Sequence, residues 1–122
     1  MLKIKTGTST NSQASMAGKE AAAQVKENLQ DMKMAFVYSG VQYDQKELLD
    51  AVSEELPGVP LIGNTSFTGV ITQEGFVSSS DGFVGVMALS DPELKVSVAG
   101  MPKEGTARET GHKVAAEALR RS

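Results

Sequence analysis

Polar side chains that could bind a ligand follow a short apolar run in the middle of the chain. Val59–Gly63 is predicted to be a β-strand, because a β-branched and leucine-rich run is typical of a parallel strand buried on both faces. Asn64, Thr65 and Ser66 come directly after it. In open α/β sheets, ligands bind at the carboxyl ends of the strands. We therefore expect these amide and hydroxyl groups to bind a small polar molecule, with Gly63 allowing a close approach of the backbone.

Two other predicted strand ends carry small polar residues. Gly7 and Thr8 lie in a loop predicted at Thr6–Ser12, where they could hold an anion at the start of the following helix. Ser39 and Gly40 end the second predicted strand, so the three strand ends could form one rim. The loop has neither a dinucleotide fingerprint nor a phosphate-loop ending. At every strand end the plainer alternative stays open, that these residues only satisfy the backbone of a turn.

The chain contains no recognisable set of catalytic residues. It has no cysteine and a single histidine, His112. The lack of cysteine excludes thiol nucleophiles, thiolate metal sites and disulfides. His112 has no recognisable nucleophile or orienting group, and one histidine among scattered carboxylates lacks the spacing of metal ligands. We therefore expect no enzyme activity, no catalytic residue, no metal site and no cofactor.

Size, charge and composition indicate one ordinary globular domain. The chain has 122 residues, a net charge of −3, and no tryptophan among its few aromatic residues. This composition predicts no affinity for nucleic acid or for anionic membranes. No apolar run approaches the roughly 20 residues that a membrane helix needs, and the N-terminus does not resemble a signal peptide. Together with the lack of cysteine, these features predict a cytoplasmic protein.

The order of predicted elements indicates an α/β fold. The first half alternates strand, helix, strand, helix and strand, which is typical of parallel strands joined by crossovers. The second half predicts short antiparallel strands and a last helix, with neither a linker nor an internal repeat. We expect a mostly parallel sheet of about three strands, extended by antiparallel strands, with three helices. The predicted strands are Leu2–Lys5, Met34–Tyr38, Val59–Gly63, Gly69–Thr72, Gly75–Ser79, Phe83–Leu89 and Leu94–Met101. The predicted helices start at Ser15, Asp44 and Thr106, and the first runs to about Leu29.

Six short phrases occur in a characteristic order: Ala17–Ala22, Tyr43–Asp44, Glu47–Leu49, Pro60–Gly69, Gly75–Phe76 and Phe83–Leu89. In this order they resemble the N-terminal domain of the FIST family, a sensory input domain of signalling proteins. The resemblance covers almost the whole chain. Where the family usually shows Gly-Cys-Ser/Thr-Thr-x-Gly-Glu, this sequence has Asn64 in place of cysteine and Val70 in place of the acidic residue. Asn64 therefore favours binding over thiol chemistry at this position.

The resemblance implies a sensory domain that binds a small metabolite, with amino acids as one candidate class. It also implies a signal passed to a FIST C-terminal-type domain or another output domain. Since the family's N-terminal domain is usually longer, we expect residues 1–122 to form a single, incomplete domain of this type. Two alternatives stay open. One is a non-catalytic assembly module that pairs with a second domain or, as a homodimer, with a second copy; the less favoured one is an enzyme acting through the strand-end hydroxyls.

Overall fold

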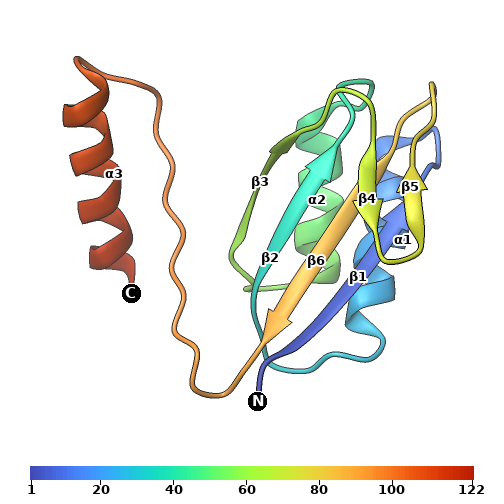
Figure 1. Cartoon of the computed structure of the whole chain (residues 1–122), viewed down its shortest axis with the longest axis horizontal. Coiled ribbons are helices and arrows are strands. Elements are labelled where there is room, and N and C mark those ends of the chain that lie inside the picture. Colours follow the sequence, from blue (N-terminus) through green and yellow to red (C-terminus); the bar gives the residue numbers. More distant parts are fainter.

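A computed structural model describes residues 1–122 and has an α/β fold with a four-stranded sheet, a separate two-stranded hairpin and three helices (Figure 1). The predicted fold class and number of helices are therefore confirmed. The strands are β1 (Lys3–Ser9), β2 (Met32–Ser39), β3 (Leu61–Thr65), β4 (Val70–Thr72), β5 (Gly75–Val77) and β6 (Val84–Ser90). The helices are α1 (Ala14–Lys26), α2 (Gln45–Glu55) and α3 (Ala107–Arg121).

The sheet has the strand order β1-β6-β2-β3. β6 pairs antiparallel with both β1 and β2, and β3 pairs parallel with β2. β1, β2 and β3 therefore run in the same direction, as their order in the sequence predicted. β6 is inserted between them rather than added at an edge, because the β4–β5 hairpin returns the chain to the centre of the sheet. The buried apolar run Val84–Val86 suits this central place.

Both α1 and α2 cover the same face of the sheet (Figure 1). Ala17, Ala21 and Ala22 of α1 are completely buried. Such small side chains bring the helix axis close to its neighbours, and Gly18 lies at the contact with α2. A Cβ atom on Gly18 would lie 2.8 Å from the carbonyl oxygen of Leu48 in α2. The main core is therefore a single layer between these two helices and one face of the sheet.

The start of α2 and the start of α3 confirm the predicted caps. The side chain of Asp44 accepts a hydrogen bond from the Glu47 amide over 3.1 Å. Thr106 accepts the equivalent bond from Glu109 over 3.1 Å. Each bond satisfies one amide that has no partner within its helix. None of the three helices has the length and apolar content needed to cross a bilayer.

The limits of α1 differ from the prediction. The helix begins at Ala14, so Ser15 lies in its first turn and is not the cap. The chain turns earlier because the side chain of Asn11 accepts a hydrogen bond from the Gln13 amide over 2.9 Å. α1 ends at Lys26 rather than near Leu29.

The predicted strand Leu94–Met101 is wrong. Residues 91–106 contain neither helix nor strand; we call them the arm, because they connect β6 to a helix that stands apart from the sheet (Figure 1). The alternation of apolar residues in the arm is a strand signal, but strand pairing also needs a neighbour that supplies backbone partners. No sheet strand pairs with the arm.

The contact at Gly18 leads to a first testable prediction. Gly18→Ala should lower the free energy of unfolding by about 1–3 kcal/mol, because α1 must move away from the Leu48 carbonyl. Gly111→Ala is the matched control in α3, since a Cβ atom there meets nothing within 4 Å. Urea unfolding of both variants measures the difference, and equal stability of the two variants would contradict this account of the core.

Candidate functional site

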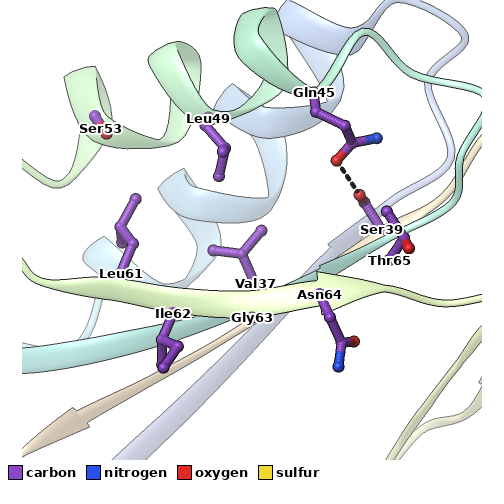
Figure 2. Close-up of a pocket in the computed structure, with 10 residues that line it drawn as sticks. All are labelled: Val37, Ser39, Gln45, Leu49, Ser53, Leu61, Ile62, Gly63, Asn64 and Thr65. Atoms are coloured by element: carbon purple, nitrogen blue, oxygen red, sulfur yellow. Dashed lines mark hydrogen bonds between the residues drawn. The ribbon is translucent and has the colours of Figure 1, made fainter. Parts of the chain in front are cut away.

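A cleft of about 350 Å³ lies between α2 and β3 (Figure 2). One wall is a single face of α2, the floor is β2, and the other wall is β3. The lining residues are Val37, Ser39, Gln45, Leu49, Ser53, Leu61, Ile62, Gly63, Asn64 and Thr65. Four of them, Ser39, Gly63, Asn64 and Thr65, are residues that the sequence predicted for a ligand site.

The cleft exists because β3 is an edge strand. The expectation of a strand buried on both faces is wrong, since Leu61 is half-buried and the rest of β3 is exposed. Leu49 of α2 and Ile62 of β3 keep 42% and 43% of their surface exposed. The apolar composition of Val59–Gly63 fits a central strand equally well, so it could not reveal that the helices leave this edge uncovered.

One end of the cleft is polar and rigidly held. Ser39 is 2% exposed, and its hydroxyl donates a hydrogen bond to Gln45 Oε1 over 2.9 Å (Figure 2). Gln45 Nε2 in turn donates to the carbonyls of Gly40 and Tyr43, both over 3.1 Å. The Gln45 amide is therefore fixed in one orientation. Sequence reasoning missed Gln45, although its place directly after the helix cap at Asp44 is a signal that could have identified it.

The side chains of β3 alternate between the cleft and the opposite side. Figure 2 shows Leu61 and Thr65 on the side of α2, whereas Ile62 and Asn64 point away from it. This follows from the two-residue period of a strand. Thr65 pairs with Ser39 across the two strands, so its hydroxyl also belongs to the polar end of the cleft. The predicted binding role of Asn64 would have to act from the other face of the sheet.

Gly63 allows β3 to lie against β2. A Cβ atom at this position would fall 1.7 Å from the carbonyl oxygen of Val37. No other residue fits without displacing the strand. The glycine predicted to allow a close approach to a ligand therefore already serves a close approach between two strands.

Ser66 is used by the turn that follows β3. Its amide donates to the Ser39 carbonyl over 2.7 Å, and its hydroxyl donates to the Gly69 carbonyl over 2.5 Å. This is the alternative in which a strand-end hydroxyl satisfies the local backbone. Ser66 is not part of the cleft lining, so its predicted ligand-binding role has no support in this geometry.

Gly7 and Thr8 lie in β1 and not in a loop. The prediction of a loop from Thr6 is wrong, because β1 extends to Ser9. A Cβ atom on Gly7 would lie 2.2 Å from the Ala21 carbonyl oxygen, so this glycine lets α1 approach the sheet. Thr8 exchanges two backbone hydrogen bonds with the Gln24 side chain, of 3.0 and 2.8 Å. Neither residue lines the cleft.

A separate polar network joins the end of β1 to α1. Ser9 and Asn11 donate to the carboxylate of Glu20 over 2.6 and 3.1 Å, and these hydrogen bonds lower the pKa of Glu20. The hydroxyl of Tyr43 donates to the Asn11 carbonyl over 2.6 Å. Burial, together with the charge of Glu20, raises the pKa of Tyr43. The network fixes the loop before α1.

The groups that line the cleft suit the binding of a small molecule. Its lining contains hydroxyl, amide and apolar groups but no ionisable side chain. Acid–base catalysis needs an ionisable group within hydrogen-bond reach of the substrate, and a serine nucleophile needs an adjacent base. Elsewhere in the structure, no group of three or more His, Cys, Asp or Glu residues could hold a metal ion.

Comparison with known proteins places this fold in a family. The sequence profile of the FIST N domain matches residues 33–122, about three quarters of the 122 residues. The match includes all ten residues that line the cleft. A search of curated proteins finds no match to the chain.

Gly63 gives the second prediction. Gly63→Ala should cost about 1–3 kcal/mol of stability, because the added methyl group overlaps the backbone of β2. Relative to wild type, amide exchange should become faster in β3 and change less in β6. Gly100→Ala is the control, since a Cβ atom there meets nothing within 4 Å. Unchanged exchange in β3 would show that the two strands are not packed as described.

Glu20 gives a third prediction, in the pH dependence of stability. Because the folded protein lowers the pKa of Glu20 below its ordinary value of 4.5, the ionised form stabilises the fold above about pH 4.5, and this stabilisation is lost as the pH falls through the lower folded pKa. Glu20→Gln should therefore be less stable than wild type at pH 7 and nearly equal at pH 2. The carboxylate is exposed, so the difference at pH 7 should stay below about 1 kcal/mol.

Urea unfolding at both pH values measures this effect. Glu54→Gln, at an exposed carboxylate outside the network, is the control and should follow wild type at both pH values. A Glu20→Gln variant that loses the same stability as wild type on acidification would contradict the network.

Proposed function

Since the chain belongs to the FIST N domain family, we propose that it is a sensory input domain whose α2–β3 cleft binds a small metabolite without net charge. Amino acids in their zwitterionic form are the first class to test. Its partner is an output domain, which responds when the cleft is occupied.

The observation that carries this proposal is the division of the cleft into a polar end and an apolar wall. Ser39, Gln45 and Thr65 supply hydroxyl and amide groups at one end, whereas Leu49 and Leu61 line the wall. A small ligand with a polar head and a short apolar tail matches this division. The volume of about 350 Å³ is near the lower end of ligand pockets, roughly 300–1,000 Å³, which favours a metabolite over a larger cofactor.

Because the lining has no ionisable side chain, it favours a ligand without net charge. An ion without an opposite charge or several hydrogen bonds loses more by desolvation than it gains in a partly closed cleft. A zwitterion has no net charge. Its carboxylate accepts a bond from the Thr65 hydroxyl, since the hydrogen of the Ser39 hydroxyl is already donated to Gln45 Oε1.

Binding gives the fourth prediction. Screening the twenty amino acids by thermal unfolding should find compounds that raise the melting temperature. At a free concentration of about 100 times Kd, binding adds about 2.7 kcal/mol, or roughly 8–16 °C for a domain of this size. If no amino acid at 10 mM shifts the transition, this ligand class is wrong.

Two neighbouring residues of β3 locate the site. Thr65→Val removes a hydroxyl at constant shape and should weaken binding at least roughly tenfold, the effect of one hydrogen bond to a charged group, about 1.5–3 kcal/mol. Asn64→Ala is the matched control, because the Asn64 side chain points away from the cleft (Figure 2). If Asn64→Ala abolishes the thermal shift and Thr65→Val preserves it, the ligand binds on the opposite face of the sheet.

A further inference from the structure

α3 is a helix without a covering surface. It has 15 residues, none of them buried, and Leu119 keeps 76% of its surface exposed. Isolated helices shorter than about 12–15 residues are marginal in water, so α3 needs another surface to become firmly helical. Figure 1 shows the helix beyond the β3 side of the sheet, with the arm between them.

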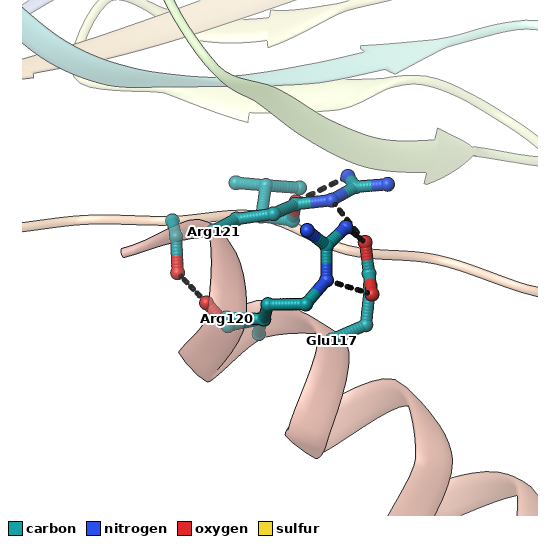
Figure 3. A network of polar contacts seen from close by, with 6 residues as sticks. Glu117, Arg120 and Arg121 are labelled. Carbon is teal, nitrogen blue, oxygen red and sulfur yellow. Dashed lines mark hydrogen bonds and ion pairs between the residues drawn. The ribbon is translucent and has the colours of Figure 1, made fainter.

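Hydrogen bonds hold α3 against the arm (Figure 3). The hydroxyl of Ser97 donates to the Ala118 carbonyl, and Arg121 Nη1 donates to the Val98 carbonyl over 2.9 Å. Arg121 also pairs with Glu117 over 2.9 Å. Hydrogen bonds from two neighbouring arginines lower the pKa of Glu117 to about 2, so this carboxylate stays ionised at neutral pH. The arm and α3 therefore form one unit, which lies outside the sheet.

α3 repeats the pattern of small residues that α1 has. Gly18 is the fifth residue of α1, and Gly111 is the fifth residue of α3. Three residues further on, α1 has Ala21-Ala22-Ala23 and α3 has Val114-Ala115-Ala116. In α1 the residues around this glycine are buried against the sheet and α2. α3 therefore has the sequence of a helix that packs on a sheet, but no sheet lies beneath it.

The four-stranded sheet has no helix on the face opposite α1 and α2 (Figure 1). The β4–β5 hairpin covers one end of this face, where Gln73 bonds to Thr6 and Val70 lies over Gly85. The rest is apolar, and we call it the open sheet face. Its residues form two rows across the strands, Ile4–Leu89–Met34 and Met87–Phe36–Ile62.

All six side chains of the open sheet face remain at least partly exposed. Ile4 and Ile62 keep 49% and 43% of their surface in solvent. A contiguous apolar patch of this kind on a folded domain marks an interaction site. Its alternating residues belong to the strands that bury Ala35, Val37 and Val86 on the helix side, so the patch lies opposite α1 and α2.

We propose that two copies of this chain pair reciprocally, with α3 of each copy lying on the open sheet face of the other. The position of α3 favours a second copy over the same chain, because the helix lies beyond β3, with the arm between it and its own sheet (Figure 1). The 16 residues from Asp91 to Thr106 can span up to roughly 50 Å when extended, which is enough to reach a neighbouring molecule.

The size of the contact fits a stable pair. A helix of 15 residues is about 22 Å long. Two reciprocal helix-on-sheet contacts of this length bury on the order of 1,500 Å² in total, within the standard range for specific interfaces. A single contact would bury about half of that area and fall below this range, so the pairing is expected to be symmetric.

The fifth prediction tests this pairing by sedimentation velocity of the full chain between about 1 and 200 µM. Wild type should sediment as a concentration-dependent dimer. Leu119→Glu should weaken the dimer at least about tenfold, because it places an unpaired carboxylate in an apolar contact. Lys113→Glu, on the charged side of α3, is the matched control and should leave the dimer unchanged. Since α3 buries no residue, both variants should keep the wild-type melting temperature when monomeric.

The sheet side of the contact is tested by Ile62→Lys, which should weaken the dimer to a similar extent. An equal mixture of Leu119→Glu and Ile62→Lys should recover dimers, because the hybrid has one unchanged contact and places the introduced carboxylate opposite the introduced ammonium group. A monomeric wild type throughout the range, a Leu119→Glu variant that pairs like wild type, or a mixture without hybrids would each overturn the proposal. The first outcome would assign α3 to a different protein or to its own sheet.

Discussion

The close approach of α1 to its neighbours is the constraint on which the rest of this structure depends. Gly7 places the helix against β1, and Gly18 places it against α2, both at distances where a Cβ atom would meet a backbone carbonyl within 3 Å. Two helices that pack this tightly cover β1, β6 and β2 and leave β3 exposed. The α2–β3 cleft is therefore a consequence of small residues in α1, a helix that does not line the cleft.

The sequence predicted the parts of the fold that local chemistry determines. The hydrogen bond from Glu47 to Asp44 is such a part, since a capping box needs only four consecutive residues. The common direction of β1, β2 and β3 followed from their alternation with helices. Three predicted site residues, Ser39, Gly63 and Thr65, lie together on the cleft side, because parallel strands bring their carboxyl ends to one edge.

The parts that sequence reasoning missed depend on contacts between distant residues. Whether Asn64 or Thr65 faces α2 is set by the register of β3 on β2, and a shift of one residue would exchange them. The hydroxyl of Ser66 bonds to the Gly69 carbonyl, a choice that depends on the path of the following turn. The alternation in the arm is a strand signal, but the arm forms no strand, because pairing requires a neighbour that this sheet does not provide.

β3 borders both the cleft and the arm–α3 unit. Leu61 lines the cleft on one side and, with Pro60, faces Val96 and Val98 of the arm on the other. β3 therefore lies between the cleft and the arm–α3 unit. A ligand can change the position of that unit only to the extent that it binds two arrangements of β3 with different affinity. β3 meets the structural requirement for such a difference, because it has one hydrogen-bonded neighbour and an exposed edge, whereas a strand such as β6 is fixed on both sides. A sensor built in this way would transmit its signal through its least constrained strand, and the chain places both its cleft and its arm there.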